Sequence, residues 1–158
     1  MNKRNQVLLL IGVVILLIAI NYSFLDKTLM NFLGESKFSG AMILTTDPKV
    51  VCTSGYSASV RDVSLELKKQ LYKMNGLSYP QPRGTVQVDH IIPLELGGSN
   101  NIRNLQVEMK EPRPGYLEKE RVENYLHRLV CTGNMELEEA QIQIATNWTE
   151  IYEIVLKK

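Results

Sequence analysis

The segment VDHIIPLELGGSNNIRNL, residues 88–105, decides how this sequence is interpreted. A carboxylate residue, Asp89, directly precedes one of the two histidines of the chain, His90. A Gly-Gly pair offers a turn after several β-branched residues, and residues 102–107 resume an extended pattern. The segment therefore predicts a β-hairpin with Asp89 and His90 on its first strand.

The side chains of Asp89 and His90 suit phosphodiester chemistry. Histidine has an ordinary pKa of about 6.5, so His90 can take a proton from water at neutral pH. The carboxylate of Asp89 is a hard oxygen ligand of the kind that binds Mg²⁺. Adjacent residues of a regular strand point to opposite faces, so both side chains reach one site only if the strand ends or distorts there. Pro93 favours a strand end, because proline cannot donate to a sheet ladder.

This order of residues, completed by Asn104 fourteen positions after His90, resembles that of the HNH nucleases. The resemblance implies an α+β fold with a ββα-metal hairpin-helix core and flanking helices. It also implies that Asp89 and His90 are catalytic, with Asp89 binding the metal. By the same resemblance, Asn104 holds the loop that carries the histidine, through hydrogen bonds to the main chain. The helix after the hairpin is expected over residues 117–130.

The similarity extends over residues 51–152 and points to a bacterial and phage subgroup of small HNH-like proteins. The chain lacks the CxxC pairs with which more familiar HNH proteins bind a structural zinc. The resemblance implies one divalent ion, Mg²⁺ or Mn²⁺ first, with Zn²⁺ or Ni²⁺ as alternatives. We expect its ligands to be Asp89 and a helix glutamate, Glu123 before Glu120, with His127 as a third choice. The alternative is that these glutamates form a solvated face paired with neighbouring basic residues.

The net charge of the chain does not by itself predict nucleic-acid binding. The formal charge is +1, and removing Lys3 and Arg4 leaves −1, so no global field steers DNA toward the protein. The balance is uneven, because residues 49–128 are basic overall and the segment after them is acidic. We expect contacts with nucleic acid, DNA being favoured, from three basic residues near the hairpin: Arg61, Arg103 and Lys119.

The first 25 residues have the pattern of a targeting segment. Lys3 and Arg4 precede residues 7–20, which contain no charged or polar side chain. Counted through Leu25, the apolar stretch approaches the roughly 20 residues of a membrane-spanning helix. We predict an uncleaved signal-anchor over residues 1–25, with a cleaved signal peptide or a buried helix as alternatives. By the positive-inside rule the rest of the chain lies outside the cytoplasm.

The chain has two cysteines, Cys52 and Cys131. In an oxidising compartment an even pair predicts a disulfide. The alternative is two buried thiols. A zinc site is disfavoured, because the cysteines and histidines lack the usual ligand spacing.

The remaining chain divides into a linker and one domain. Residues 26–49 are interrupted by glycines, serines and an Asp-Pro pair, and we predict a linker or stalk. Residues 50–158 are long enough for one compact domain. Within it, Ser64 can cap a helix, and a last helix runs from about residue 137 to residue 155. Trp148 on that helix is most simply part of the core.

Together these features predict a metal-dependent HNH-type endonuclease that hydrolyses nucleic acid outside the cytoplasm and is held at the membrane by its N-terminal helix. One alternative is a catalytically silent HNH-like module that binds nucleic acid or a protein. Another is a membrane-tethered structural protein with a coincidental hairpin. An immunity or regulatory protein is a further conceivable partner, of unknown identity.

Overall fold

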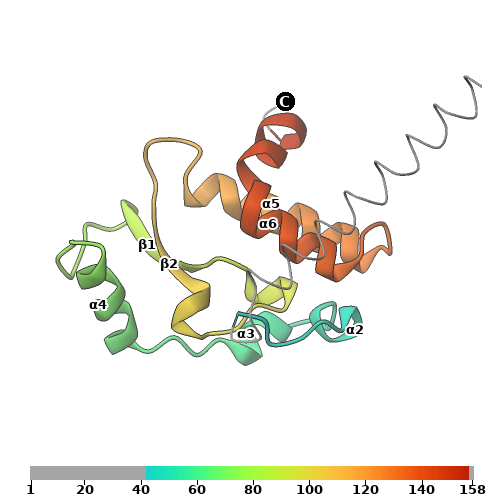
Figure 1. Ribbon diagram of the computed structural model, residues 1–158, viewed down its shortest axis with the longest axis horizontal. Coiled ribbons are helices and arrows are strands. Elements are labelled where there is room, and N and C mark those ends of the chain that lie inside the picture. The colour runs from blue at the N-terminus through green and yellow to red at the C-terminus, as the bar shows by residue number, and fades with distance from the viewer. Residues whose placement is uncertain (1–41, 157–158) are drawn as a thin grey trace, which may run out of the picture. The chain divides into compact units, whose positions relative to one another are not determined.

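The computed structural model describes residues 42–156, which form an α+β domain with one two-stranded sheet (Figure 1). Its elements are α2 (Pro48–Val51), α3 (Tyr56–Val60), α4 (Leu65–Met74), β1 (Val86–His90), the 3-10 turns Leu94–Leu96 and Ile102–Asn104, β2 (Leu105–Met109), α5 (Tyr116–Cys131), α6 (Leu137–Ile151) and a closing π-helical turn, Tyr152–Leu156. The α+β class predicted from the sequence is confirmed. Within the described span, no helix is long and apolar enough to cross a membrane. The predicted leader, residues 1–25, lies outside the described residues.

The predicted hairpin is formed by β1 and β2, which pair antiparallel from Val86 opposite Met109 to His90 opposite Leu105. β1 ends at His90, three residues before Pro93, in keeping with the strand end that this proline favoured. The second strand starts later than the sequence pattern suggested. Residues 102–104 form a 3-10 turn, because the side chain of Asn101 accepts a hydrogen bond from the Arg103 N–H and caps that turn. The connection between the strands is therefore a folded loop, residues 91–104, and not a tight turn.

The Gly97-Gly98 pair lets this loop pack against main chain on two sides. Gly97 has a φ of +81°, a conformation that side chains disfavour. A Cβ on Gly98 would overlap the carbonyl oxygen of Ile92 and would lie 2.8 Å from the side-chain nitrogen of Asn104. Both glycines are required, because a Cβ on Gly97 would overlap the carbonyl oxygen of Thr45 and a Cβ on Gly98 would overlap the loop itself.

Helices α5 and α6 pack side by side (Figure 1) and supply most of the core. The predicted helix over residues 117–130 is confirmed and extends one residue further at each end. Its buried stripe is Val122, Leu126 and Val130, at the spacing of one helix face. Trp148 packs against the same core, as predicted.

Residues 42–49, which the sequence pattern placed in a linker, belong to the domain. Met42 is 8% exposed and lies in the core, and Ile43 forms a β-bridge with Gly98. Asp47 caps α2 by accepting a hydrogen bond from the Lys49 N–H. The domain therefore includes residues 42–49, which lie before the predicted boundary at residue 50.

A disulfide joins Cys52, at the end of α2, to Cys131, at the end of α5. The Cα atoms are 5.6 Å apart, and the two positions are separated by 79 residues of sequence. The predicted pairing is confirmed, and the alternative of two free thiols is wrong.

Candidate active site

Asn104 fastens the loop that follows β1. Its side chain is fully buried, accepts a hydrogen bond from the Ile92 N–H at 2.9 Å and donates to the carbonyl oxygens of Ile92 and Ser99, both at 2.9 Å. These are side-chain to main-chain bonds of the kind that the HNH resemblance implied for this asparagine. They hold the chain only two residues after His90, so the direction in which β1 presents its last side chain is fixed.

His90 is 4% exposed, and its ring is held by a residue that the sequence interpretation missed, Asn100. The ring Nε2 lies 3.1 Å from Asn100 Oδ1, and Asn100 Nδ2 donates to the carbonyl oxygen of Val60 at 2.7 Å. Because Asn100 uses its donor elsewhere, it presents an acceptor to the ring. Nε2 therefore carries the ring hydrogen, and Nδ1 keeps its lone pair. The sequence did offer a signal for this contact, namely a second asparagine, Asn100, in the loop that follows His90.

Burial lowers the pKa of His90 below its ordinary value, and this effect outweighs the hydrogen bond to Asn100 and the charge of Asp89, which raise it. The positive charge of Arg61 also lowers the pKa of His90. The imidazole is therefore neutral at pH 7, the form in which it can accept a proton.

The two side-chain oxygens of Asp89 have partners other than the imidazole ring of His90. Its Oδ1 accepts the His90 main-chain N–H at 2.9 Å, and its Oδ2 lies 3.1 Å from Nζ of Lys119. Burial by itself raises the pKa of Asp89, but the charge and hydrogen bonding of Lys119 and the His90 N–H outweigh burial and lower it. Asp89 is thus a carboxylate paired with an ammonium group.

Lys119 is 1% exposed and lies at the centre of three carboxylates. Its Nζ is 2.7 Å from Glu123 Oε1, 3.1 Å from Asp89 Oδ2 and 3.3 Å from Glu108 Oε1, and it donates to the His90 carbonyl oxygen at 2.7 Å. Burial lowers the pKa of this ammonium group, but the surrounding carboxylates raise it by more. The sequence interpretation placed Lys119 among the DNA contacts. That assignment does not hold, because the side chain is enclosed by the site and does not reach the surface.

We call Asp89, Glu108 and Glu123 the carboxylate cluster. Burial raises the pKa of Glu108 and of Glu123 to about 7 each, although the charge of Lys119 opposes the shift. One oxygen of Glu108, Oε2, is buried without a hydrogen-bond partner among the described residues. One ammonium group therefore does not balance the three carboxylates when all are ionised.

Glu108 is the member of the cluster that the sequence interpretation missed. Gln106 lies opposite Asp89 in the hairpin, and strand alternation places Glu108 on the same face as Gln106. The signal was present in the sequence, but reading it required the register of the two strands. That register depends on the folded loop between them, whose shape the sequence pattern did not show.

The structure separates the two helix glutamates that were predicted as metal ligands. Glu123 is in the cluster, whereas Glu120 is exposed and contributes its main-chain carbonyl to a hydrogen bond from Asn124. Glu95, on the 3-10 turn after β1, has its Oε1 buried without a partner among residues 42–156, and burial raises its pKa. Glu95 is therefore a better candidate for the periphery of the site than Glu120.

The predicted divalent ion, held jointly by Asp89 and Glu123, does not fit this arrangement. Divalent ions bind carboxylate oxygens at roughly 2.0–2.6 Å. The space between these two carboxylates already holds Nζ of Lys119, bonded to both. An ion bound to the same two oxygens would lie beside a protonated amine, so the residues do not fit it while Lys119 is charged.

His127, the third choice as a ligand, belongs to another part of the domain. Its Nε2 lies 3.1 Å from the Val51 carbonyl oxygen and 3.4 Å from Cys131 Sγ. Ligand atoms of Cys52, His127 and Cys131 all lie within 4.8 Å of one another, as they would around a metal ion. The two sulfur atoms are bonded to each other, however, and thus are not thiolate ligands.

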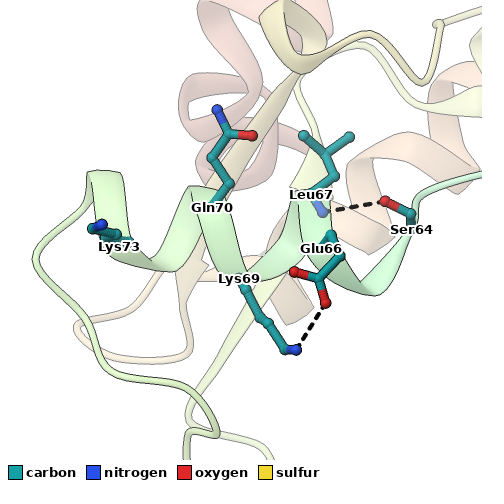
Figure 2. A pocket seen from close by; sticks show the side chains of 6 residues that line it. All are labelled: Ser64, Glu66, Leu67, Lys69, Gln70 and Lys73. Carbon is teal, nitrogen blue, oxygen red and sulfur yellow. Dashed lines mark hydrogen bonds and ion pairs between the residues drawn. The ribbon is translucent and has the colours of Figure 1, made fainter.

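The other predicted DNA contacts, Arg61 and Arg103, are exposed. Arg61 directly follows Val60, whose carbonyl accepts the amide of Asn100, so it lies next to the His90 site. A separate hollow lies on α4 and shares no residue with that site (Figure 2). Its basic members are Lys69, which is paired with Glu66 at 2.8 Å, and Lys73.

Comparison with protein-family models, with curated proteins and with solved structures finds no match for this chain. The resemblance to HNH nucleases consequently depends on the sequence pattern alone, the motif of residues 88–105 and the similarity over residues 51–152.

Proposed function

We propose that this protein is an HNH-type endonuclease that hydrolyses phosphodiester bonds of nucleic acid, with DNA as the favoured substrate. The observation that carries the proposal is the arrangement of His90. Its imidazole is neutral at pH 7, its Nε2 is fixed by Asn100, and the loop that follows it is fastened by Asn104. A general base needs this combination of protonation state and fixed orientation.

In the proposed reaction, Nδ1 of His90 takes a proton from a water molecule. The water oxygen attacks phosphorus, the bond from phosphorus to the leaving oxygen breaks, and the leaving oxygen takes a proton from solvent. Arg61 is exposed beside His90 and is the residue best placed to bind a phosphate. Lys119 supplies fixed positive charge within the adjacent carboxylate cluster. No step of this proposal passes through a metal ion.

The disulfide supports an extracytoplasmic location, because such bonds persist mainly in oxidising compartments. We propose accordingly that the domain acts outside the cytoplasm. Attachment to the membrane through residues 1–25 stays a prediction that concerns residues outside the described range.

A second candidate, the catalytically silent module, is favoured by two specific observations. His90 keeps only 4% of its surface exposed, and the carboxylate cluster is already occupied by Lys119. A module of this kind would bind nucleic acid or a protein through the Arg61 side of the hairpin without cleaving it.

One experiment separates the two candidates. The full-length protein is incubated with supercoiled plasmid and, separately, with single-stranded RNA, each in Mg²⁺, Mn²⁺, Ni²⁺, Zn²⁺ or EDTA. Nicked or linear products support the nuclease, and the EDTA arm shows whether an ion is needed. Binding in a gel-shift assay without any product in any arm supports the silent module and overturns the proposal.

A further inference from the structure

We infer that Lys119 is the resident cation of the carboxylate cluster, that it keeps divalent ions out, and that removing its ammonium group turns the cluster into a divalent-cation site. The inference deepens the proposed function at the same site and rests on it only for the role of the charge in hydrolysis. The cluster itself is described by geometry that does not depend on any activity.

Nζ of Lys119 lies at the point where the three carboxylates of the cluster meet. Lys119 and Glu123 are four residues apart on one face of α5, and Asp89 and Glu108 come from the two strands beneath it. Carboxylates from three elements therefore converge on one point, and Nζ lies within 3.3 Å of an oxygen from each. This convergence of hard oxygen atoms is what Mg²⁺ or Mn²⁺ binds, but the ammonium group is already at that point.

The charges of the carboxylate cluster and of Lys119 do not balance. With all three carboxylates ionised, Lys119 neutralises only one of three negative charges. Glu108 adds a buried oxygen, Oε2, that has no hydrogen-bond partner within residues 42–156, and its side chain is only 9% exposed. Without Lys119 the cluster would hold three largely buried carboxylates, whose charge protons or a cation would have to offset. A divalent ion would then compensate two charges and bond several of the free oxygens.

His90 is tied to the same ammonium group, because Nζ also donates to the His90 carbonyl oxygen at 2.7 Å. Lys119 is thus a positioning residue for the base as well as the cation of the cluster. Replacing Lys119 by an apolar residue therefore also removes a hydrogen bond from the main chain of His90.

The test measures Mn²⁺ binding to the full-length protein by isothermal titration calorimetry and by the loss of the free-Mn²⁺ electron paramagnetic resonance signal. Lys119→Met removes the charge and keeps the aliphatic stem. Lys119→Arg keeps the charge, and Lys73→Met removes one positive charge from an exposed position. We expect Lys119→Met to bind one Mn²⁺ about tenfold or more tightly than wild type, in keeping with the removal of a like charge at contact distance. Wild type, Lys119→Arg and Lys73→Met should not differ from one another.

Two further measurements keep the test decisive if Lys119→Met fails to fold. The double variant Lys119→Met/Glu108→Gln removes one buried carboxylate with the ammonium group and should still gain Mn²⁺ binding through Asp89 and Glu123. In wild type, Mn²⁺ should not selectively broaden the amide NMR signals of residues 89, 90 and 123. Selective broadening there, or a folded Lys119→Met or Lys119→Met/Glu108→Gln variant without gained binding, overturns the inference. Because none of these readouts uses cleavage, a failed nuclease assay leaves this result standing, and the reverse also holds.

Discussion

The three side-chain to main-chain hydrogen bonds of Asn104, here called the Asn104 clamp, give the sharpest prediction for stability. Asn104→Ala removes one acceptor, which serves the Ile92 N–H, and two donations, to the carbonyl oxygens of Ile92 and Ser99. Asn104 and Ile92 are both fully buried, so water does not replace these bonds without a rearrangement of the loop. The variant therefore leaves buried main-chain groups unsatisfied next to His90.

The magnitude follows from these contacts. A buried polar group left without a partner costs roughly 1–3 kcal/mol, and an ordinary hydrogen bond contributes about 1 kcal/mol. Two groups of Ile92 lose their partners in the core, and Ser99 is partly exposed. We expect Asn104→Ala to lower the free energy of unfolding by about 3–4 kcal/mol, a large share of the roughly 5–15 kcal/mol that stabilises a domain.

The assay is urea unfolding followed by circular dichroism, with the slope of the transition compared between variants. Asn101→Ala is the matched control, because this neighbouring asparagine is exposed and caps only the short turn that begins at residue 102. Its loss should cost about 1 kcal/mol. If Asn104→Ala costs no more than Asn101→Ala, the clamp is not what holds the loop, and the reasoning fails.

Three further predictions concern titration and the disulfide. If His90 is the base, the cleavage rate should rise with pH through a pKa below 6.5 and be level at pH 7, because burial depresses that pKa; a rate that still climbs steeply above pH 7 would assign the base elsewhere. The folded-state pKa of Glu108 is raised to about 7 from 4.5, so the stability linked to its proton is present below pH 4.5 and is lost as the pH rises through 7. Glu108→Gln should therefore gain stability relative to wild type between pH 5 and pH 8 in urea titrations, and a constant difference would contradict the shift. For the disulfide, the separation of 79 residues gives a loop-entropy contribution of about 4–5 kcal/mol; urea unfolding of Cys52→Ala/Cys131→Ala should show a loss of that order, and a loss below about 1 kcal/mol would mean that the unfolded chain is not constrained by the bond.

Much of the frame of this site was predictable from sequence because it depends on local patterns. The hairpin, the strand end at His90 and helix α5 follow from β-branched residues, a proline and a 3.6-residue apolar period. The disulfide followed from the cysteine count and the expected compartment. The α+β class could be predicted for the same reason.

The centre of the site was not predictable in this way, because it depends on register and burial. Lys119 has the pattern of a surface lysine on a charged helix, and only its packing over β1 and β2 shows that it is enclosed. Glu120 and Glu123 share a face by spacing, yet a rotation of the helix by a fraction of a turn decides that Glu123 enters the cluster and Glu120 does not. Asn100 needed the shape of the loop before its contact with His90 could be seen.

The central claim, that His90 is the base of a phosphodiester-cleaving site, is tested most directly by comparing the two histidines of the chain. Full-length His90→Ala and His127→Ala are assayed on supercoiled plasmid under the same conditions, with circular dichroism to establish that both are folded. His127 is the matched control, since its ring contacts the Val51 carbonyl and the disulfide and not the carboxylate cluster. We predict that His90→Ala lowers the cleavage rate by about 10²–10⁴, the usual contribution of a general base, whereas His127→Ala stays within a few-fold of wild type. Cleavage by folded His90→Ala at the wild-type rate, or a loss confined to His127→Ala, would contradict the account.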